Sequence, residues 1–345
     1  MVDGAGIGFR PQLASALLRR PERVGFLEVV AESCRAPAVR REIVALSRVW
    51  PVVLHGVSLS PGSAAGIDPA RSEWFGDLAR ELRASLVSEH MAFVRAGGRE
   101  IGHLTELPRT REAVAVLARN VATLRRSLPD VPLLLENPAR AFVWRTHEMT
   151  EGQFLHEVTA ATGCPLLLDV ANLHANAMNG EVTTLEGLPL DRVGLVHVAG
   201  GDVENGYYFD THAHAVPEPV FALAAAVLRH RAVPVLLERD GGFEDPDAIL
   251  AEVDRLRAMT SITDLGAQQS EMARLLLGEE PAPHLEHART ILRRKEKQHE
   301  RSVRCVAVEH GPWRVLPRFL RDALRGRDAG GAADREPLRR TGPIA

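Results

Sequence analysis

Eight short apolar runs recur along the first part of the chain, and their number and spacing constrain the fold more than any other feature. Continuously apolar runs, without alternation, are typical of parallel strands that are covered on both faces. Helical patterns such as Glu112–Leu124 and Val220–His230 lie between them. The sequence therefore predicts an α/β fold, a (β/α)8 TIM barrel, for which about 250 residues is the usual size. The predicted strands are Ile7–Phe9, Phe26–Val30, Val52–His55, Leu86–His90, Pro132–Glu136, Pro165–Asp169, Val193–Val198 and Val233–Glu238.

An open, doubly wound sheet is the alternative that the same pattern allows. Such a sheet often binds a nucleotide on a glycine-rich turn that follows its first strand. Neither a GxGxxG nor a GxxxxGKS motif follows the first strands here. This absence argues against the nucleotide-binding form of the open sheet.

The last part of the chain differs from the rest in charge. Residues 281–345 contain 15 Lys and Arg against 8 Asp and Glu, a net charge of +7, which leaves −10 for residues 1–280. We expect residues 1–280 to form the barrel domain, 281–325 a short helical basic extension and 326–345 a disordered tail. An acidic barrel is a poor nucleic-acid binder, because phosphate contacts need clustered positive charge.

The cysteines and the hydropathy pattern exclude further classes of protein. Cys34, Cys164 and Cys305 form no CxxC motif, so neither a disulfide framework nor a thiolate zinc site is indicated. No apolar run approaches the ~18 residues that span a bilayer. The start at Met1–Gly4 has no basic segment before an apolar one. We therefore expect a cytoplasmic protein without a membrane partner.

Ionisable side chains lie at the end of five of the eight apolar runs and one residue before the end of a sixth, at His197. In a parallel barrel these strand ends converge on one mouth, so residues distant in sequence come close together. A buried charge costs free energy that a partner charge or a metal ion offsets. Because carboxylates such as Glu136 can bridge two ions, the pattern predicts a polynuclear iron, manganese or zinc site. Its strand-end candidates are His55, His90, Glu136, Asp169, His197 and Glu238, and the motif DTHAH, expected on a loop, adds Asp210, His212 and His214.

Several other polar residues have an intermediate status. His103, His174, Glu28 and Glu32 could reach the mouth or could have a purely structural role. No GxSxG motif or other nucleophile motif is present, so covalent catalysis by serine or cysteine has little support.

The order of the motifs resembles that of a known enzyme family. GIGFRP, FLEV, HGVSLS, SEH, LLLEN, LLLDVAN, HVAG, DTHAH and LLERD follow one another over about residues 5–257, as in the multinuclear non-haem iron-dependent oxidases. The resemblance implies a TIM barrel that holds two to three iron ions in a mixed-valent Fe(II)/Fe(III) state, with O2 as co-substrate. It further implies oxidative modification of a residue, often Cys, Asn or Asp, in a ribosomally synthesised precursor peptide, which a partner protein or a fused module presents.

The resemblance also carries roles over to single residues. It implies that Asp240 lies near the substrate as a proton acceptor and that His214 and Asn172 are polar groups beside the cluster, which makes these three the catalytic candidates. The family's DVNN-type motif reads DVAN here, with Ala171 in place of the first amide. That departure affects hydrogen bonding around the metal ligands and not the ligands themselves. The implied iron ligands are His55, His90, Glu136, Asp169, His197, Asp210, His212 and Glu238.

Two other functions are compatible with the residues. A divalent-metal hydrolase or isomerase of the endonuclease IV or xylose isomerase type also gathers His, Asp and Glu at strand ends. A metal- or peptide-binding protein without catalytic activity is the second alternative. The basic extension either caps the barrel or, with apolar residues such as Trp313 and Phe319, helps to recognise the peptide.

Overall fold

Eight parallel strands close into a barrel in the part of the chain that the structure describes, residues 2–181, 184–261 and 290 of a computed structural model. Each strand pairs in parallel with its two neighbours, and the last pairs with the first. This closure confirms the predicted TIM barrel and rules out the open sheet. In barrel order the strands are β1 (Ala5–Gly8), β2 (Leu27–Val30), β3 (Val52–Gly56), β4 (Leu86–His90), β7 (Leu133–Glu136), β8 (Leu166–Asp169), β9 (Val193–Val198) and β12 (Val235–Leu237).

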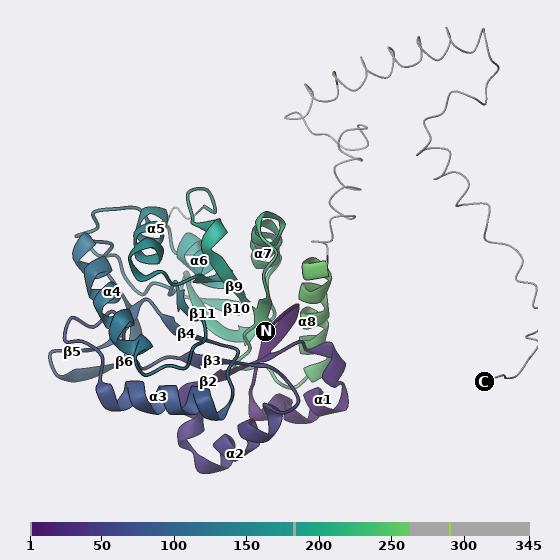
Figure 1. Cartoon of the computed structure of the whole chain (residues 1–345). Coiled ribbons are helices and arrows are strands. Elements are labelled where there is room, and N and C mark those ends of the chain that lie inside the picture. The colour runs from purple at the N-terminus through teal and green to yellow at the C-terminus, as the bar shows by residue number, and fades with distance from the viewer. Residues whose placement is uncertain (1, 182–183, 262–289, 291–345) are drawn as a thin grey trace, which may run out of the picture. The chain divides into compact units, whose positions relative to one another are not determined.

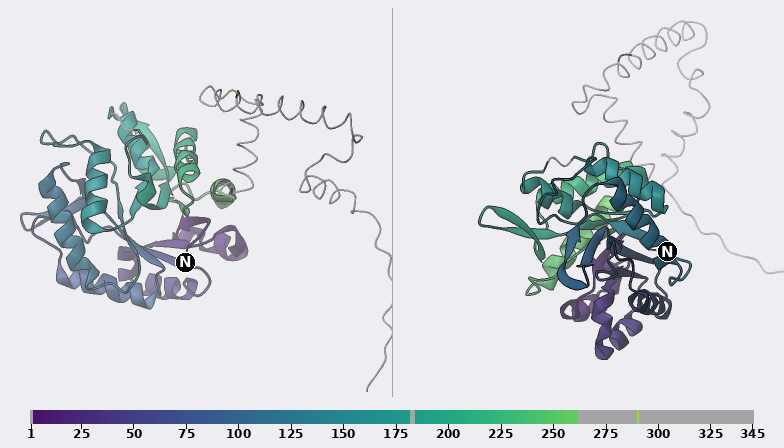
Figure 2. Two further views of the ribbon diagram at one scale, coloured as in Figure 1. Left: turned by 45° about the horizontal axis from the view of Figure 1, so that its top comes forward. Right: turned by 90° about the vertical axis from the view of Figure 1, so that its left-hand side faces the viewer.

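Helices surround the strands on the outside of the barrel (Figures 1 and 2). Local capping sets several of their ends: Thr150 and Gln153 form a capping box at the start of α5 (Glu151–Thr162), and Gly163 ends that helix at a φ of +67°. Asp68 and Thr110 accept backbone N–H groups at the starts of α3 (Pro69–Glu81) and α4 (Arg111–Arg125). The helices are α1 (Ala14–Arg19), α2 (Pro37–Leu46), α3 (Pro69–Glu81), α4 (Arg111–Arg125), α5 (Glu151–Thr162), α6 (Val170–Met178), α7 (Glu218–His230) and α8 (Pro246–Ser261).

Two antiparallel hairpins follow barrel strands at the mouth. β5 (Ala92–Ala96) and β6 (Arg99–Glu106) come after β4, and β10 (Gly200–Glu204) and β11 (Tyr207–His214) come after β9. The DTHAH motif lies on β11, so the expectation that it lies on a loop was wrong. The physical reason is the Asn205–Gly206 turn: both residues have positive φ, as tight hairpin turns require.

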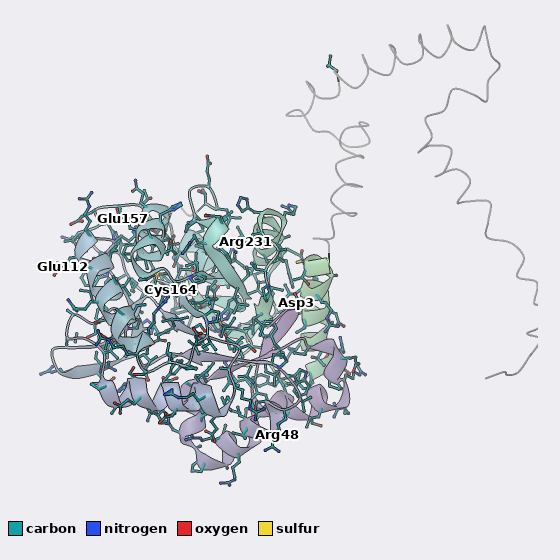
Figure 3. All side chains as sticks on the ribbon, viewed as in Figure 1. Asp3, Arg48, Glu112, Glu157, Cys164 and Arg231 are labelled. Atoms are coloured by element: carbon teal, nitrogen blue, oxygen red, sulfur yellow. The ribbon has the colours of Figure 1, made fainter. Side chains whose placement is uncertain are left out.

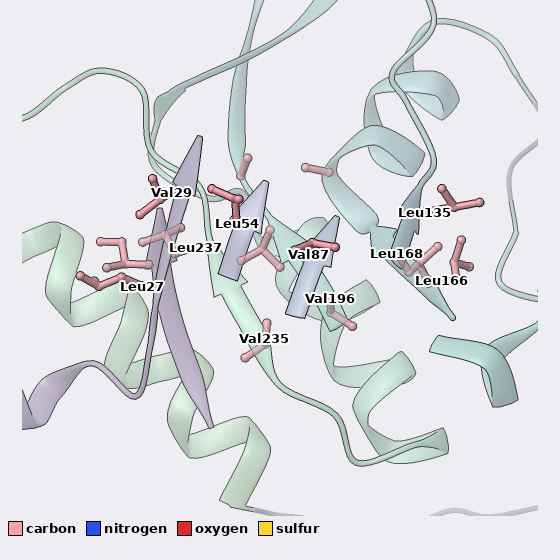
Figure 4. Packing of buried hydrophobic residues seen from close by; sticks show 14 of the residues in the cluster. Leu27, Val29, Leu54, Val87, Leu135, Leu166, Leu168, Val196, Val235 and Leu237 are labelled. Atoms are coloured by element: carbon pink, nitrogen blue, oxygen red, sulfur yellow. The ribbon is translucent and has the colours of Figure 1, made fainter. Parts of the chain in front are cut away.

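Most of the core lies between the barrel strands and the surrounding helices. Its members alternate along most strands, because successive side chains point to opposite faces. Figure 4 shows this packing for residues such as Leu54, Val87 and Leu237. Charged side chains such as Arg48, Glu112, Glu157 and Arg231 are exposed on the outside, whereas Cys164 is buried (Figure 3).

The barrel interior consists of an apolar layer below an ionisable one. A separate buried cluster contains Val2, one apolar residue from each of six strands, and Phe26 just before β2. Two positions after most of these residues, on the same face, an ionisable side chain reaches the mouth, as Val53 is followed by His55 and Leu134 by Glu136. On β1 a side chain at Gly6 would lie 2.5 Å from the ring of Phe26, so glycine leaves room for this layer. The cluster is Val2, Phe26, Val53, Leu86, Leu134, Leu167, Leu195 and Leu236.

The predicted basic extension (281–325) and the predicted tail (326–345) lie outside the described residues, apart from Thr290. Among the helices of the described part, none has the length and apolarity that crossing a bilayer requires.

Candidate metal centre

Two groups of buried donor atoms meet at the barrel mouth. In each group, one nitrogen or oxygen atom from every member lies within 4.8 Å of the others. Five of the residues end or lie on barrel strands, and Glu238 directly follows β12. Glu136 belongs to both groups. The first group is His55, His90 and Glu136, and the second is Glu136, Asp169, His197 and Glu238.

The two carboxylate oxygens of Glu136 face different groups. Oε2 lies 3.6 Å from Nε2 of His55 and 3.4 Å from Nε2 of His90. Oε1 lies 3.6 Å from Nδ1 of His197. These separations exceed the usual hydrogen-bond length, and they place one oxygen beside each group of donors. This is the arrangement that a carboxylate needs to bridge two metal ions.

In His55 and His90, the ring nitrogen that points away from Glu136 contacts another group of the protein. Nδ1 of His55 lies 2.8 Å from Oγ of Ser88, and Nδ1 of His90 donates to the Gly56 carbonyl at 3.3 Å. Because a neutral imidazole carries one proton, a donor on the far nitrogen leaves the near nitrogen free to accept. Such outer partners orient metal-ligating histidines in proteins.

Several of the buried polar atoms that have no hydrogen-bond partner in the described part of the chain lie in the same region. They cannot be left unpaired without a free-energy cost. A metal ion bound among them would satisfy several at once, and the mixed imidazole and carboxylate donors suit iron, manganese or zinc. The residues therefore fit a metal cluster. The atoms are Glu136 Oε2, Asp169 Oδ2, His197 Nδ1 and Asp210 Oδ1.

The charges of the clustered side chains also favour the binding of cations. Burial raises the pKa of Asp169, and the nearby Asp210 and Glu136 raise it further. Burial opposes ionisation of Glu136 as well, but His90 and His197 outweigh it and lower its pKa to about 2. Burial lowers the pKa of His90, while Glu136 and Glu89 outweigh that effect and raise it to about 9. Carboxylates packed this closely need cations among them.

The β10–β11 hairpin adds donors above the barrel strands. Nε2 of His212 lies 2.8 Å from Oδ2 of Asp210, and its Nδ1 lies 3.4 Å from Oε2 of Glu238. His212 has a φ of +52°, a strained conformation for a residue other than glycine. Its carbonyl accepts the backbone N–H of Asp240 at 2.6 Å, which ties the hairpin to the end of β12. All eight residues that the resemblance implies as ligands thus gather at one mouth.

The three catalytic candidates differ in position. Asp240 lines the cavity, and its Oδ1 accepts from Nε of Arg10 at 2.6 Å while its Oδ2 lies 3.7 Å from Nδ1 of His212. Asn172 also lines the cavity. His214 is exposed and contacts Oγ1 of Thr211, and it is not among the residues that line the cavity.

The residues of intermediate status separate in the structure. Glu28 is buried and its Oε2 lies 2.9 Å from Nε2 of His197, on the far side from Glu136. Glu32 accepts from Oγ of Ser58 and supports the loop after β3. His103 lines the mouth cavity. His174 packs edge-on against Tyr208, with ring centroids 5.1 Å apart.

Sequence reasoning missed Arg10 and Glu89. Arg10 pairs with Asp240 across 230 positions, for which no local signal exists. Glu89 is buried and accepts the N–H groups of Leu59 at 3.0 Å and Ser60 at 3.1 Å. Its position inside the SEH motif was a usable signal, because a second ionisable residue beside a ligand at a strand end is seldom buried without a partner.

A family model for the RiPP precursor modification enzyme MbnB/TglH/ChrH matches residues 4–261, which covers the whole barrel. The chain belongs to this family. RiPPs are ribosomally synthesised and post-translationally modified peptides, so the family placement confirms the resemblance seen in the motifs and indicates an enzyme that modifies precursor peptides.

The chain is also similar to several other proteins. A UPF0276 protein from Streptomyces avermitilis is 43% identical over 266 residues, 74% of this chain, which spans 54% of that protein's length. A UPF0276 protein from Caulobacter vibrioides is 38% identical over 264 residues, 74% of this chain and 94% of that protein. Among solved structures, endonuclease IV from Thermus thermophilus is 18% identical with a TM-score of 0.47, covering 73% of this chain and 98% of that one.

Proposed function

We propose that this chain is an iron- and O2-dependent oxidase that modifies a residue of a ribosomally synthesised precursor peptide. The observation that carries the proposal is the position of Glu136 between two sets of donors, with one oxygen toward each. The family placement supports the peptide as substrate. Imidazole and carboxylate donors without thiolate suit iron as well as manganese and zinc, and the resemblance in the motifs favours iron among these. The resemblance in the motifs favours two to three ions in a mixed-valent state and Cys, Asn or Asp as the modified residue.

The proposed ligands divide between the two donor groups and the hairpin. His55, His90 and Glu136 would hold one ion, and Glu136, Asp169, His197 and Glu238 a second. Asp210 and His212 extend the donor set from β11 toward Glu238. Iron bound there would supply one-electron redox chemistry and reaction with O2.

Arg10 and Asp240 would together provide the acceptor for a proton of the substrate. Arg10 holds Oδ1 of Asp240, which leaves Oδ2 on the side of His212 and within the lining of the cavity. We propose that Oδ2 of Asp240 accepts a proton from the bound peptide. A general base must lie within reach of the proton that it removes, and Asp240 lines the space that the peptide would enter.

Presentation of the peptide is part of the proposal. We propose that a partner protein, or residues 281–325 together with such a partner, captures the precursor and delivers it to the barrel domain of residues 1–280. About 45 residues are too few to bury an independent core, so the extension would need a second surface.

The test is reconstitution of the full chain with Fe(II) without oxygen, followed by addition of a candidate precursor peptide encoded beside the gene and then of O2. The proposal predicts oxygen consumption and a mass change in the peptide that depend on iron. Matched samples loaded with zinc or manganese are the control. Peptide cleavage or isomerisation by those samples, without oxygen uptake, would contradict an oxidase and favour the hydrolase or isomerase alternative.

A further inference from the structure

One face of the β10–β11 hairpin combines two aromatic rings with two carboxylates. In the register of the hairpin, Asp202 pairs with Phe209 and Glu204 pairs with Tyr207. Residues directly opposite each other in an antiparallel pair have their side chains on the same face, with Cβ atoms about 5 Å apart. Each ring therefore has a carboxylate beside it. We name these four residues the hairpin face.

The two rings form the part of the hairpin face that borders the metal site. Tyr207 and Phe209 both line the mouth cavity, and their ring centroids lie 4.9 Å apart at an angle of 59°. The hydroxyl of Tyr207 donates to the Arg140 carbonyl at 2.6 Å, which holds its ring against the loop after β7. Phe209 is 44% exposed, so a ligand can contact its ring. Exposed apolar surface of this kind, next to a cavity, is typical of a binding surface.

The two carboxylates extend the hairpin face away from the cavity. Asp202 and Glu204 are exposed and do not line the mouth cavity. Neither forms an ion pair within the described part of the chain, and the printed partner of Asp202 is the backbone N–H of Val203, at 2.8 Å. The hairpin face thus carries two negative charges that no lysine or arginine of the described residues balances.

The arginines that line the mouth cavity already have carboxylate partners. Arg10 pairs with Asp240, and Arg140 pairs with Glu151 and Glu181. They are therefore occupied where they lie and do not neutralise the hairpin face. A ligand that neutralises it has to bring its own positive charge.

A cationic side chain suits this combination of groups better than an apolar or an acidic one. An ammonium or guanidinium group is attracted to the face of an aromatic ring when it lies within about 6 Å of the ring centre. The long stems of lysine and arginine contact apolar surface while their charged ends stay close to carboxylates or water. An apolar side chain over the rings would take water from the neighbouring carboxylates without pairing them, which costs free energy. An acidic side chain would be repelled.

We propose that the hairpin face binds a lysine or arginine of the substrate peptide, close to the residue that enters the metal site. The inference rests on the proposed function in that it takes a peptide as the substrate. It adds a sequence requirement, a basic residue near the modified one. Because salt screens exposed charges, this recognition weakens as ionic strength rises.

The test selects its own probe. A random library of displayed decapeptides is selected against the Fe(II)-loaded full chain without oxygen, and in parallel against a variant that combines Asp202→Asn with Glu204→Gln. We expect the wild type to enrich peptides with lysine or arginine at one position, and the variant to lose this enrichment.

A matched control separates the hairpin face from the overall acidity of the barrel. It combines Glu22→Gln with Glu42→Gln, which removes the same amount of charge at exposed positions before β2 and on α2. Both positions lie away from the β10–β11 hairpin in the chain, and the control should enrich the same basic peptides as the wild type. Loss of the enrichment in the control as well would overturn the proposal, because it would show that only the total charge matters.

A neutral substitute in the selected peptide measures the contact itself. Citrulline replaces arginine, or N-acetyllysine replaces lysine, and fluorescence anisotropy measures the affinity. We expect this change to weaken binding to the wild type about three- to tenfold, the combined effect of an exposed cation–π contact and exposed ion pairs. In the variant with Asp202→Asn and Glu204→Gln the loss should be smaller, since a double-mutant cycle isolates the interaction between the two changed groups.

Phe209→Leu distinguishes the ring from apolar surface in general. Leucine keeps an apolar side chain but has no aromatic face, so the basic peptide should bind less tightly, about two- to fivefold, and its neutral counterpart should not. Circular dichroism and iron content should equal those of the wild type, because Phe209 and its neighbour Asp210 lie on opposite faces of β11. No enrichment of basic residues by the wild type, or an equal loss from the neutral substitute in wild type and variant, would overturn the proposal.

The outcome for the oxidase proposal is read separately. Basic peptides that bind through the hairpin face, without oxidation of a precursor by the iron-loaded chain, would support the hairpin face and count against the oxidase. Oxidation of a precursor by the variant with Asp202→Asn and Glu204→Gln, at the wild-type rate and with the wild-type KM, would do the reverse.

Discussion

Oε2 of Glu28 lies 2.9 Å from Nε2 of His197, a contact that joins β2 to β9 through the barrel interior. The other ring nitrogen, Nδ1, lies 3.4 Å from Oε2 of Glu238 and has no hydrogen-bond partner in the described part of the chain. The carboxylate behind the ring therefore fixes which nitrogen faces the cluster, as outer carboxylates do in metal sites.

Replacing Glu28 by glutamine should weaken metal binding without unfolding the barrel. The amide keeps the size of the side chain but removes the negative charge behind His197, and loss of such a partner costs about 10- to 100-fold in metal affinity. Competition with a chelator, followed by elemental analysis, measures the change. Glu22→Gln, at an exposed position before β2, is the matched control. Equal affinity in both variants would show that Glu28 has no part in orienting the ligand.

Two substitutions of His212 should distinguish the role of its side chain in turnover from the effect of its strained backbone on stability. We expect His212→Ala to abolish turnover and to leave the circular dichroism spectrum unchanged, because a hairpin residue contributes little to the core. His212→Gly should also be inactive but more stable than His212→Ala by about 1 kcal/mol, because glycine adopts the φ of +52° without strain. Thermal unfolding of the two variants checks the order. A collapsed spectrum in both would mean that the hairpin is structural.

Removal of the Glu89 carboxylate should destabilise the loop after β3. Glu89 accepts the N–H groups of Leu59, Ser60 and His90, and Ser60 holds a φ of +63°. Glu89→Ala leaves these buried donors unpaired, with an expected loss of about 3 kcal/mol in the free energy of unfolding. Urea unfolding measures it, with the exposed Glu73→Ala on α3 as control. A loss no larger than that of the control would contradict this anchoring role.

The thiol of Cys34 should be unreactive in the folded protein. Burial raises its pKa to about 11, from an ordinary value of 9.0. Its folded pKa lies above the unfolded one, so ionisation in the unfolded chain lowers stability as pH rises from about 9 to about 11, with no effect below about pH 8. In a Cys305→Ser background, an aromatic disulfide reagent at about pH 8 should label Cys34 only after denaturant is added. Rapid labelling of the native protein at this site would contradict the buried position.

The sequence predicted the barrel and the gathering of ligands for one reason. On most strands, the ionisable side chain at the mouth comes two residues after a buried apolar side chain that points to the same face, as His55 follows Val53. The end of an apolar run therefore shows both where the strand ends and which residue reaches the mouth. The β10–β11 hairpin was missed because the ionisable DTHAH motif suggested a loop, although Asn205–Gly206 signals a hairpin turn.

Other contacts could not be predicted from local patterns. The pairing of Arg10 with Asp240 depends on the closure of β1 against β12, which brings together the two ends of the barrel segment. In the described part of the chain, Oδ1 of Asn172 and Nδ2 of Asn176 have no hydrogen-bond partner. The other atom of each amide pairs with the Asn137 carbonyl or the Arg140 N–H, which belong to the loop after β7. Such positions follow from tertiary structure and not from residue spacing along the chain.

The central claim is that Glu136 joins two metal ions. Elemental analysis and Mössbauer spectroscopy of the iron-loaded full chain, compared with Glu136→Ala, test it most directly. The account predicts two to three iron atoms per chain with exchange-coupled spectra in the wild type, and loss of at least one iron and of the coupling in the variant. Full iron occupancy with unchanged spectra in Glu136→Ala would contradict it.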